Sequence, residues 1–228
     1  SPPYDGLRKY KGYSFDFEPM ADELYRVTKD GGVVVWIVND ATIDGDETGT
    51  SFRQALYFKE IGFKLHDTMI WKKTNPFNFG SNYCYTQSFE YMFVFSKGKP
   101  KAINLIRDRP LKNAGKQFKQ TRRSNNDFME YDERIVTLKD VGRRFNVWEM
   151  PVQSVKGHPA PFPEQLVNDH IITWSNPGDI VLDPMCGSGT TCKMAWINKR
   201  NFIGIDISEE YIKEICIPRL ESVGWKEH

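Results

Sequence analysis

A strand, turn, helix and strand near the end of the chain constrain the fold more than any other stretch. The apolar run DIVLD (residues 179–183) ends in an acid, and the glycine-rich turn PMCGSG follows it directly. TTCKMAWINKR then has the pattern of a helix, and NFIGID that of a second buried strand. Two parallel strands joined through a helix predict an α/β fold.

The segments before this unit alternate in the same way. Helices are predicted at 15–30, 51–62 and 162–175, strands at 33–38, 64–73 and 89–98, and a closing helix from Ser208. Between 99 and about 148 the sequence is polar and basic, without a helix or strand pattern. A chain of 228 residues, 39% of them apolar, can bury one sizeable core. We expect one α/β domain with a small appendage, its mostly parallel sheet covered by helices on both faces.

The turn of the last unit predicts a ligand site. Gly187 and Gly189 follow the strand that ends at Asp183, and glycine lets a ligand approach the backbone at the carboxyl end of a parallel strand. Asp206 lies 19 residues after Gly187, where a carboxylate can accept hydrogen bonds from ribose hydroxyls. A nucleoside-containing cofactor fits this pattern, and a glycine turn that only packs a helix on a sheet is the alternative.

Other cofactor motifs do not fit the sequence. A GxGxxG fingerprint starting at Gly187 would need glycine where Cys192 stands, and no GKS or GKT follows the turn. The acidic stretch DGDETG (44–49) has Ala55 where a calcium loop needs glutamate. The histidines are scattered, at His66, His158, His170 and His228. Neither a dinucleotide, a P-loop nucleotide nor a metal is predicted.

Charge is distributed unevenly along the chain. The segment from Lys97 to Arg144 has 14 Lys and Arg against 6 Asp and Glu, a local charge of +8, although the whole chain carries +1. A basic segment on an otherwise acidic body is the footprint expected where phosphates dock. A solvated basic loop is the alternative.

Composition also indicates the cellular setting. The strongest apolar run, GGVVVWIV, has the length of a strand, so no membrane span is predicted. The first residues do not resemble a signal peptide. The cysteines, without a CxxC pair, are expected to be free thiols in a reducing compartment, which points to the cytoplasm; they are Cys84, Cys186, Cys192 and Cys216.

The first four residues, SPPY, complete a family signature. Pro2 and Pro3 have a fixed φ and no N–H, so they hold a stiff edge whose carbonyl oxygens are available as acceptors. Together, SPPY and DPMCGSGTT (183–191) resemble the motifs of the DNA amino-methyltransferases, which transfer a methyl group from S-adenosylmethionine to the exocyclic amine of cytosine or adenine. The resemblance covers nearly the whole chain and implies a Rossmann-like methyltransferase fold. The catalytic motif precedes the cofactor loop, as in the family's β group.

The resemblance assigns site residues and domains. The catalytic motif comprises Ser1, Pro2, Pro3 and Tyr4. The residues expected to bind S-adenosylmethionine are His158 and Phe162 in GHPAPFPEQL, then Asp183, Pro184, Cys186, Gly187, Ser188, Gly189 and Thr190 in the loop, and Asp206. The implied division is a catalytic half (1–98), a target-recognition region (99–150) and a cofactor-binding half (151–228).

The target-recognition region coincides with the basic segment, so double-stranded DNA is the implied partner. Phosphate contacts are expected from Lys116, Lys119, Arg122, Arg123, Arg143 and Arg144, and base contacts from Asn125 and Asn126. Relatives in the β group are often dimers, so a homodimer is a further expectation. A cognate restriction enzyme is a candidate partner that the chain itself does not indicate.

The chemistry accounts for the residue types in the catalytic motif. An exocyclic amine is a poor nucleophile because its lone pair is delocalised into the ring. If Ser1 Oγ and the Pro2 carbonyl accept its two N–H bonds, the nitrogen can become pyramidal and direct its lone pair at the methyl group. Tyr4 offers a ring on which a flipped base can stack. Methylation at carbon 5 of cytosine would need a cysteine directly after a proline, and the chain has no such dipeptide.

The target base depends mainly on the first motif residue. Serine at this position resembles the cytosine-N4 subset, and HPAPFPEQL resembles that subset more than the HPTQKP type of many adenine enzymes. Cytosine N4 is therefore favoured, with adenine N6 as the alternative. Methylation of RNA or of a protein glutamine, and an inactive nucleic-acid-binding relative, stay open.

In the resembled family the catalytic motif ends a central strand of the sheet. An apolar run should therefore precede Ser1, and the sequence begins at that residue. Loss of a central strand would leave backbone groups of both neighbouring strands without ladder partners. We expect the natural chain to include the strand upstream of Ser1.

Overall fold

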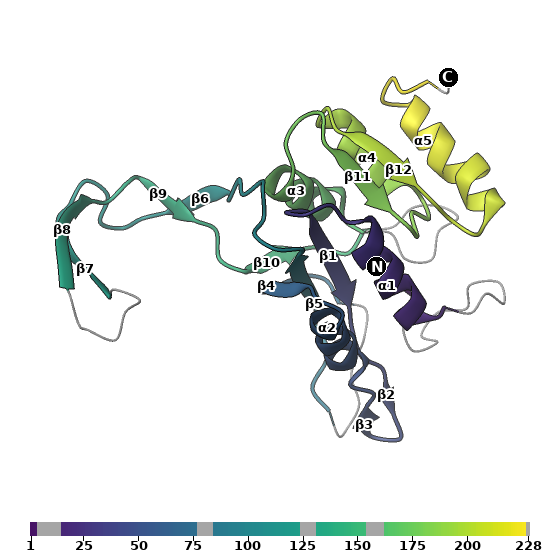
Figure 1. Ribbon diagram of the computed structural model, residues 1–228, viewed down its shortest axis with the longest axis horizontal. Helices are drawn as coiled ribbons and strands as arrows, with labels where there is room; N and C mark the ends of the chain where they lie inside the picture. Colours follow the sequence, from purple (N-terminus) through teal and green to yellow (C-terminus); the bar gives the residue numbers. More distant parts are fainter. Residues whose placement is uncertain (4–14, 77–83, 124–130, 154–161, 227–228) are drawn as a thin grey trace. The chain divides into compact units, whose positions relative to one another are not determined.

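The computed structural model describes residues 1–3, 15–76, 84–123, 131–153 and 162–226. It divides into two compact units, each described by itself (Figure 1). Unit 1 comprises Ser1–Asn104 and Asn146–His228, and unit 2 comprises Leu105–Phe145.

Unit 1 alternates helices and strands. Its helices are α1 (Phe17–Val27), α2 (Thr50–Glu60), α3 (Glu164–Trp174), α4 (Thr190–Ile197), the π-helix η1 (Tyr211–Cys216) and α5 (Ile217–Glu221). Its strands are β1 (Val33–Val38), β2 (Thr42–Ile43), β3 (Asp46–Glu47), β4 (Lys64–Lys73), β5 (Phe89–Ser96), β10 (Val147–Met150), β11 (Ile180–Asp183) and β12 (Asn201–Gly204). Among the described residues, no helix combines the length and the apolar character needed to cross a membrane.

The main sheet has the strand order β1-β5-β4-β10. Strand β5 is antiparallel to both of its neighbours, and β10 is parallel to β4. Strands β1, β4 and β10 therefore share one direction, and β5 alone is reversed. A second sheet pairs β11 with β12 in parallel, from Ile180 opposite Asn201 to Asp183 opposite Gly204.

Side-chain alternation along β5 places helices on both faces of the main sheet. Phe93 and Phe95 pack in a cluster with residues of α1 and α2, including Phe58. Met92 and Val94 point to the opposite face and pack in a cluster that includes α3. Because successive strand residues point to opposite faces, a strand buried on both sides is apolar throughout. The predicted α/β class with helices on both faces is confirmed.

Helix α3 links the two sheets of unit 1. Its Leu166 packs against the main sheet, whereas Val167 and Ile171 pack against Met194 and Ala195 of α4. Helix α4 in turn covers β11 and β12. The loop after β11 is therefore held between α4 and the core of unit 1.

Unit 2 consists of two antiparallel ladders. Strand β6 (Arg107–Pro110) pairs with β9 (Val141–Arg143), and β7 (Gln117–Arg123) pairs with β8 (Tyr131–Thr137). These strands were not predicted, because polar and charged residues dominate the segment and no apolar residues alternate with them. Strand β10 belongs to the main sheet, so the compact unit is shorter than the 99–150 region expected from the sequence.

Candidate active site

The loop after β11 brings the predicted glycines and acids together. The N–H of Met185 donates to Asp183 Oδ1 at 3.1 Å, and the N–H of Gly187 donates to Asp206 Oδ2 at 2.8 Å. The other oxygen of Asp206 accepts the N–H of Ser208, also at 2.8 Å. One carboxylate therefore connects the loop after β11 to the turn after β12. The role expected for Asp206 from its spacing, as an acceptor for ribose hydroxyls, stays a prediction.

Two glycines in the loop adopt conformations that other residues rarely adopt. Gly187 has a φ of 48° and Gly189 a φ of 73°. A Cβ atom on Gly189 would also lie 2.3 Å from Cys216 Sγ, so a larger residue would displace the end of η1. Gly189 therefore serves the close packing of the loop against the end of η1.

Arg219 of α5 donates hydrogen bonds to the end of the loop after β11 and to the start of α4. Its Nη1 donates to the Ser188 carbonyl at 2.6 Å, to Ser188 Oγ at 2.9 Å and to Thr190 Oγ1 at 3.1 Å. Its Nη2 donates to Glu164 Oε1 at 2.8 Å, and Lys193 Nζ donates to the same oxygen at 2.7 Å. The two hydroxyl groups expected to contact a cofactor are thus engaged with Arg219.

The described part of the catalytic motif lies near the cofactor loop. Pro2 is buried, and Ser1 and Pro3 are half-buried. The carboxylates of Asp183 and Glu90 both act electrostatically on the backbone nitrogen of Ser1. The acid that ends β11 is therefore close to the first motif residue.

Several predicted site residues lie outside the described residues or play a packing role. Tyr4, His158, Asn125 and Asn126 are outside the described part of the chain. Phe162 is described: its ring lies 6.1 Å from that of Trp71, and it packs beside α3. Pro184 is half-buried in the turn after Asp183.

Sequence reasoning missed a set of buried polar groups that follow β1. Asn39 donates to the Phe89 carbonyl at 3.1 Å and accepts from Gln87 Nε2 at 3.2 Å. Asp40, 3% exposed, accepts the N–H of Ser51 at 2.8 Å and so caps the start of α2. The signal was present: Asn-Asp follows the apolar run VVVWIV just as Asp183 ends its own strand.

The acceptors of this site fit a nucleoside with a cationic side chain. The Asp206 carboxylate is half-buried, and each oxygen that accepts a backbone N–H retains a second lone pair for a ribose hydroxyl. The Asp183 carboxylate, also half-buried, can face an ammonium group. S-adenosylmethionine carries both features, so the residues present suit it.

Three cysteines converge behind the loop. The Sγ atoms of Cys186, Cys192 and Cys216 lie within 4.8 Å of one another, and all three residues are buried. Among the described residues no cysteine forms a disulfide, which agrees with the predicted free thiols. Hydrogen bonds from the thiols of Cys186 and Cys192 lower the pKa of Cys216. Their separation in sequence concealed this cluster.

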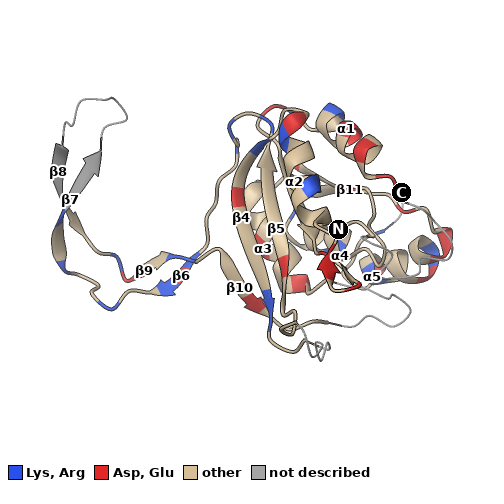
Figure 2. Cartoon of the chain, turned by 90° about the horizontal axis from the view of Figure 1, so that it is seen from below, with Lys and Arg blue, Asp and Glu red and all other residues tan. Residues whose placement is uncertain are grey.

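Figure 2 shows Lys and Arg in blue on the described part of unit 2, for example at β6. Lys116, Lys119 and Arg143 are exposed, and the backbones of Arg122 and Arg123 belong to β7. Arg144 Nε donates to Asp108 Oδ2 at 2.8 Å, so a phosphate would have to compete with this ion pair. This side-chain hydrogen bond lowers the pKa of Asp108.

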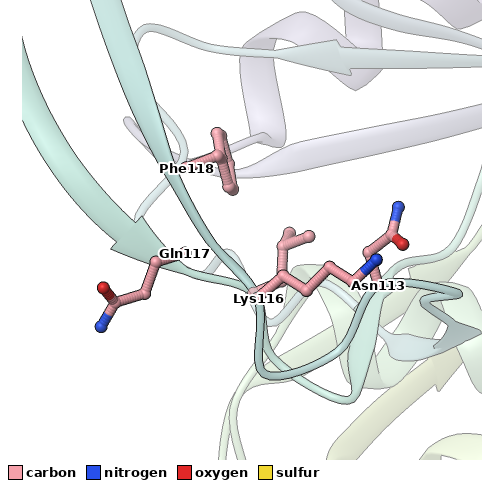
Figure 3. Close-up of a pocket in the computed structure, with 5 residues that line it drawn as sticks. Asn113, Lys116, Gln117 and Phe118 are labelled. Carbon is pink, nitrogen blue, oxygen red and sulfur yellow. The ribbon is translucent and has the colours of Figure 1, made fainter.

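Unit 2 contains a hollow of its own. It is lined by Asn113, Lys116, Gln117, Phe118 and Leu138. Figure 3 shows the Lys116 side chain extending toward Asn113, while Gln117 points away from it. Phe118 is 42% exposed, so unit 2 presents an apolar side chain among its basic ones.

Two described relatives match this chain, one over nearly its whole length and one over a shorter segment. The orphan methyltransferase M.BamHII of Bacillus amyloliquefaciens is 56% identical over 232 residues, which cover 97% of this chain and 87% of that protein. The DNA adenine methyltransferase YhdJ of Escherichia coli (strain K12) is 48% identical over 73 residues, 30% of this chain and 25% of that protein.

Solved structures share the fold. The cytosine-N4-specific PvuII DNA methyltransferase matches with a TM-score of 0.64 and 20% identity, over 92% of this chain and 74% of that one. The complex of M1.HpyAVI with SAM matches with a TM-score of 0.59 and 23% identity, over 91% and 84%. The predicted methyltransferase fold is confirmed.

A family model settles the class of protein. The model N6_N4_Mtase, described as DNA methylase, matches residues 1–216, which include both SPPY and the loop after β11. The match to the family model agrees with the 56% identity to M.BamHII, a methyltransferase by its description. The chain belongs to the N6/N4 DNA methylase family.

Proposed function

We propose that this chain transfers a methyl group from S-adenosylmethionine to the N4 amine of cytosine in double-stranded DNA. The observation that carries the proposal is the placement of Ser1 close to Asp183, at the end of the strand that leads into the cofactor loop. A motif suited to orienting an amine therefore lies beside a loop suited to a nucleoside cofactor.

The loop and its neighbours would hold the cofactor. Asp206 accepts the ribose hydroxyls, Asp183 faces the charged methionine portion, and Phe162 supplies an apolar wall. When bound, the cofactor supplies the methyl group, and the protein contributes orientation and electrostatics.

The catalytic motif would hold the target amine. Ser1 Oγ and the Pro2 carbonyl accept its two N–H bonds, which directs the nitrogen lone pair toward the cofactor. Serine is too weak a base to remove a proton beforehand, so the proton leaves during or after methyl transfer, and no covalent intermediate with the protein forms. Tyr4 provides the ring on which the flipped base stacks.

Unit 2 would contact the DNA. Exposed Lys116, Lys119 and Arg143 are suited to phosphates, and Phe118 offers an apolar contact to bases or sugars. A homodimer, a cognate restriction enzyme and a cytoplasmic location stay predictions from the sequence.

Adenine N6 is the second candidate. The segment shared with YhdJ, an adenine enzyme by its description, is 48% identical, whereas serine in the motif favours cytosine. The reaction class is tested by incubating the protein with labelled S-adenosylmethionine and unmethylated DNA, RNA or a protein mixture. We expect label in DNA alone, and none with Ser1→Ala; label in RNA or protein alone would overturn the proposal.

A further inference from the structure

The cluster formed by Cys186, Cys192 and Cys216 has a geometry that packing alone does not require. The three thiols come from the cofactor loop, from α4 and from the end of η1, and their Sγ atoms lie within 4.8 Å of one another. Each residue is at most 6% exposed. Three sulfur atoms from three elements therefore face a common centre.

Two glycines make room for these sulfur atoms. A Cβ atom on Gly189 would lie 2.3 Å from Cys216 Sγ. A Cβ atom on Gly204 would lie 2.5 Å from Cys192 Sγ and 3.2 Å from Cys186 Sγ. Any side chain at either glycine would occupy the space that the thiols fill.

Apolar residues close the rest of the cluster. Leu220 is buried with the three cysteines, and Phe202, Ile212 and Trp225 pack around them. Such a shell excludes water from the sulfur atoms, which favours binding of a soft cation over exchange with solvent.

We propose that these three cysteines form a thiolate site for a divalent, thiophilic cation of the Zn²⁺ class. Metal–sulfur bonds of about 2.3 Å place the sulfur atoms of a three- or four-coordinate site about 3.8 to 4.0 Å apart. The three Sγ atoms would have to contract by less than about 1 Å to reach this separation. Thiolate is the ligand type that selects such cations.

Nearby charges suit this assignment. Three thiolates and one divalent cation carry a net charge of −1. Lys193 follows Cys192, Arg219 lies three residues after Cys216, and both donate to Glu164. These three ionised side chains sum to +1, so the cation site and its surroundings are together neutral.

The site would connect cation binding to the cofactor loop. Cys186 stands directly before Gly187, whose N–H donates to Asp206. A bound cation would tie this loop to α4 and to the last helices. Because the site forms only in the folded chain, the cation should raise the midpoint of thermal unfolding.

Cd²⁺ is the probe that tests this site, because cadmium thiolates absorb in the ultraviolet. We expect titration of the reduced chain under anaerobic conditions to give one strongly bound Cd²⁺, a charge-transfer band of three-thiolate intensity, and a higher unfolding temperature. Zn²⁺ should compete for the same site. Cys192→Ala and Cys216→Ala should each weaken Cd²⁺ binding by at least about tenfold.

Cys84→Ala is the matched control, because Cys84 is exposed and lies outside the cluster. It should leave the affinity and the band unchanged. Circular dichroism of each variant without metal establishes that it is folded, and the band of Cys186→Ser provides an independent count of the ligands. The proposal is wrong if Cd²⁺ does not bind the folded chain, if its band survives unchanged in the cluster variants, or if the band disappears with Cys84→Ala.

Discussion

The backbone N–H of Gly187 donates to Asp206 Oδ2 at 2.8 Å, across the ends of β11 and β12. Asp206 also accepts the N–H of Ser208, so a single carboxylate fixes two loops at the edge of the parallel pair. The same carboxylate is the proposed acceptor for ribose. Its role in shaping the site and its role in binding can be separated by experiment.

Asp206→Asn tests this double role. The amide keeps one acceptor oxygen and loses the other, so we expect a loss of about 1 to 2 kcal/mol in the free energy of unfolding. S-adenosylmethionine affinity, measured by calorimetry, should fall by at least about tenfold, because the charged acceptor contributes more than a neutral one.

The matched control is Asp179→Asn. Asp179 Oδ2 accepts the N–H of Asn176 at 2.7 Å in a turn before β11. This variant should lose similar stability and keep its cofactor affinity. Equal affinity losses in both variants would show that Asp206 acts only through the fold.

Ser1→Ala removes the proposed acceptor for the target amine. Turnover should fall by about 100-fold or more, as when one preorganised hydrogen-bonding group is lost from an active site. Cofactor affinity should change little, since Asp183 and Asp206 are untouched. Steady-state methylation and calorimetry measure the two effects, and normal turnover in this variant would refute the role of Ser1.

Arg219→Met leaves several polar groups without their donor. Ser188, Thr190 and Glu164 each lose a hydrogen bond from this side chain. We expect the free energy of unfolding in urea to fall by about 1 to 3 kcal/mol. Arg26→Met removes an exposed pair with Glu23, which water screens, and should lower the free energy of unfolding far less. Similar losses in the free energy of unfolding for the two variants would contradict a stabilising role for the hydrogen bonds of Arg219.

The burial of His170 predicts how the free energy of unfolding depends on pH. The side chain is buried against Met92 and Trp148, and burial lowers its pKa to about 3. The imidazole of His170 takes up a proton near pH 6.5 in the unfolded state and only near pH 3 in the folded state. Its contribution to the free energy of unfolding is therefore fully present above about pH 6.5 and declines as the pH falls toward 3. The limiting slope is about 1.4 kcal/mol per pH unit.

His170→Leu should remove this part of the pH dependence. Urea unfolding between pH 4 and 7 should show a shallower decline for this variant than for the parent chain. Exposed His66→Leu is the control and should keep the parent slope. An unchanged slope in His170→Leu would mean that other groups govern acid unfolding.

Salt dependence tests the contribution of unit 2 to DNA binding. Lys116→Ala and Lys119→Ala should each reduce the slope of log affinity against log salt by about 0.9, the value for one lost phosphate contact. Lys59→Ala, at the exposed end of α2, is the control and should leave the slope unchanged. Equal effects of all three would place the DNA elsewhere.

The sequence predicted the elements of unit 1 because apolar periodicity is strong there. The run VVVWIV is buried in its second half and most of β5 is buried, and the structure has strands at both positions. The sequence also placed Gly187, Gly189 and Asp206 at the ends of two neighbouring strands, because glycine spacing and a terminal acid follow from local backbone requirements, but the hydrogen bond from Gly187 to Asp206 became visible only in the structure.

Unit 2 and the cysteine cluster could not be predicted in this way. Strands β6 to β9 pair through backbone ladders, and their mostly polar and charged sequences carry no period-two apolar pattern. Cys216 meets Cys186 only because η1 packs against the loop, a long-range contact that no local pattern encodes. Asn39 and Asp40 were overlooked, although they follow an apolar strand.

The most direct test of the account is nucleoside mass spectrometry. Unmethylated DNA is incubated with the protein and isotopically labelled S-adenosylmethionine, then digested to nucleosides, with Ser1→Ala as the parallel control. The account predicts label in N4-methylcytosine, and none with the variant. Label in N6-methyladenine would contradict the assignment of the base, and an absence of label from DNA would contradict the proposed reaction.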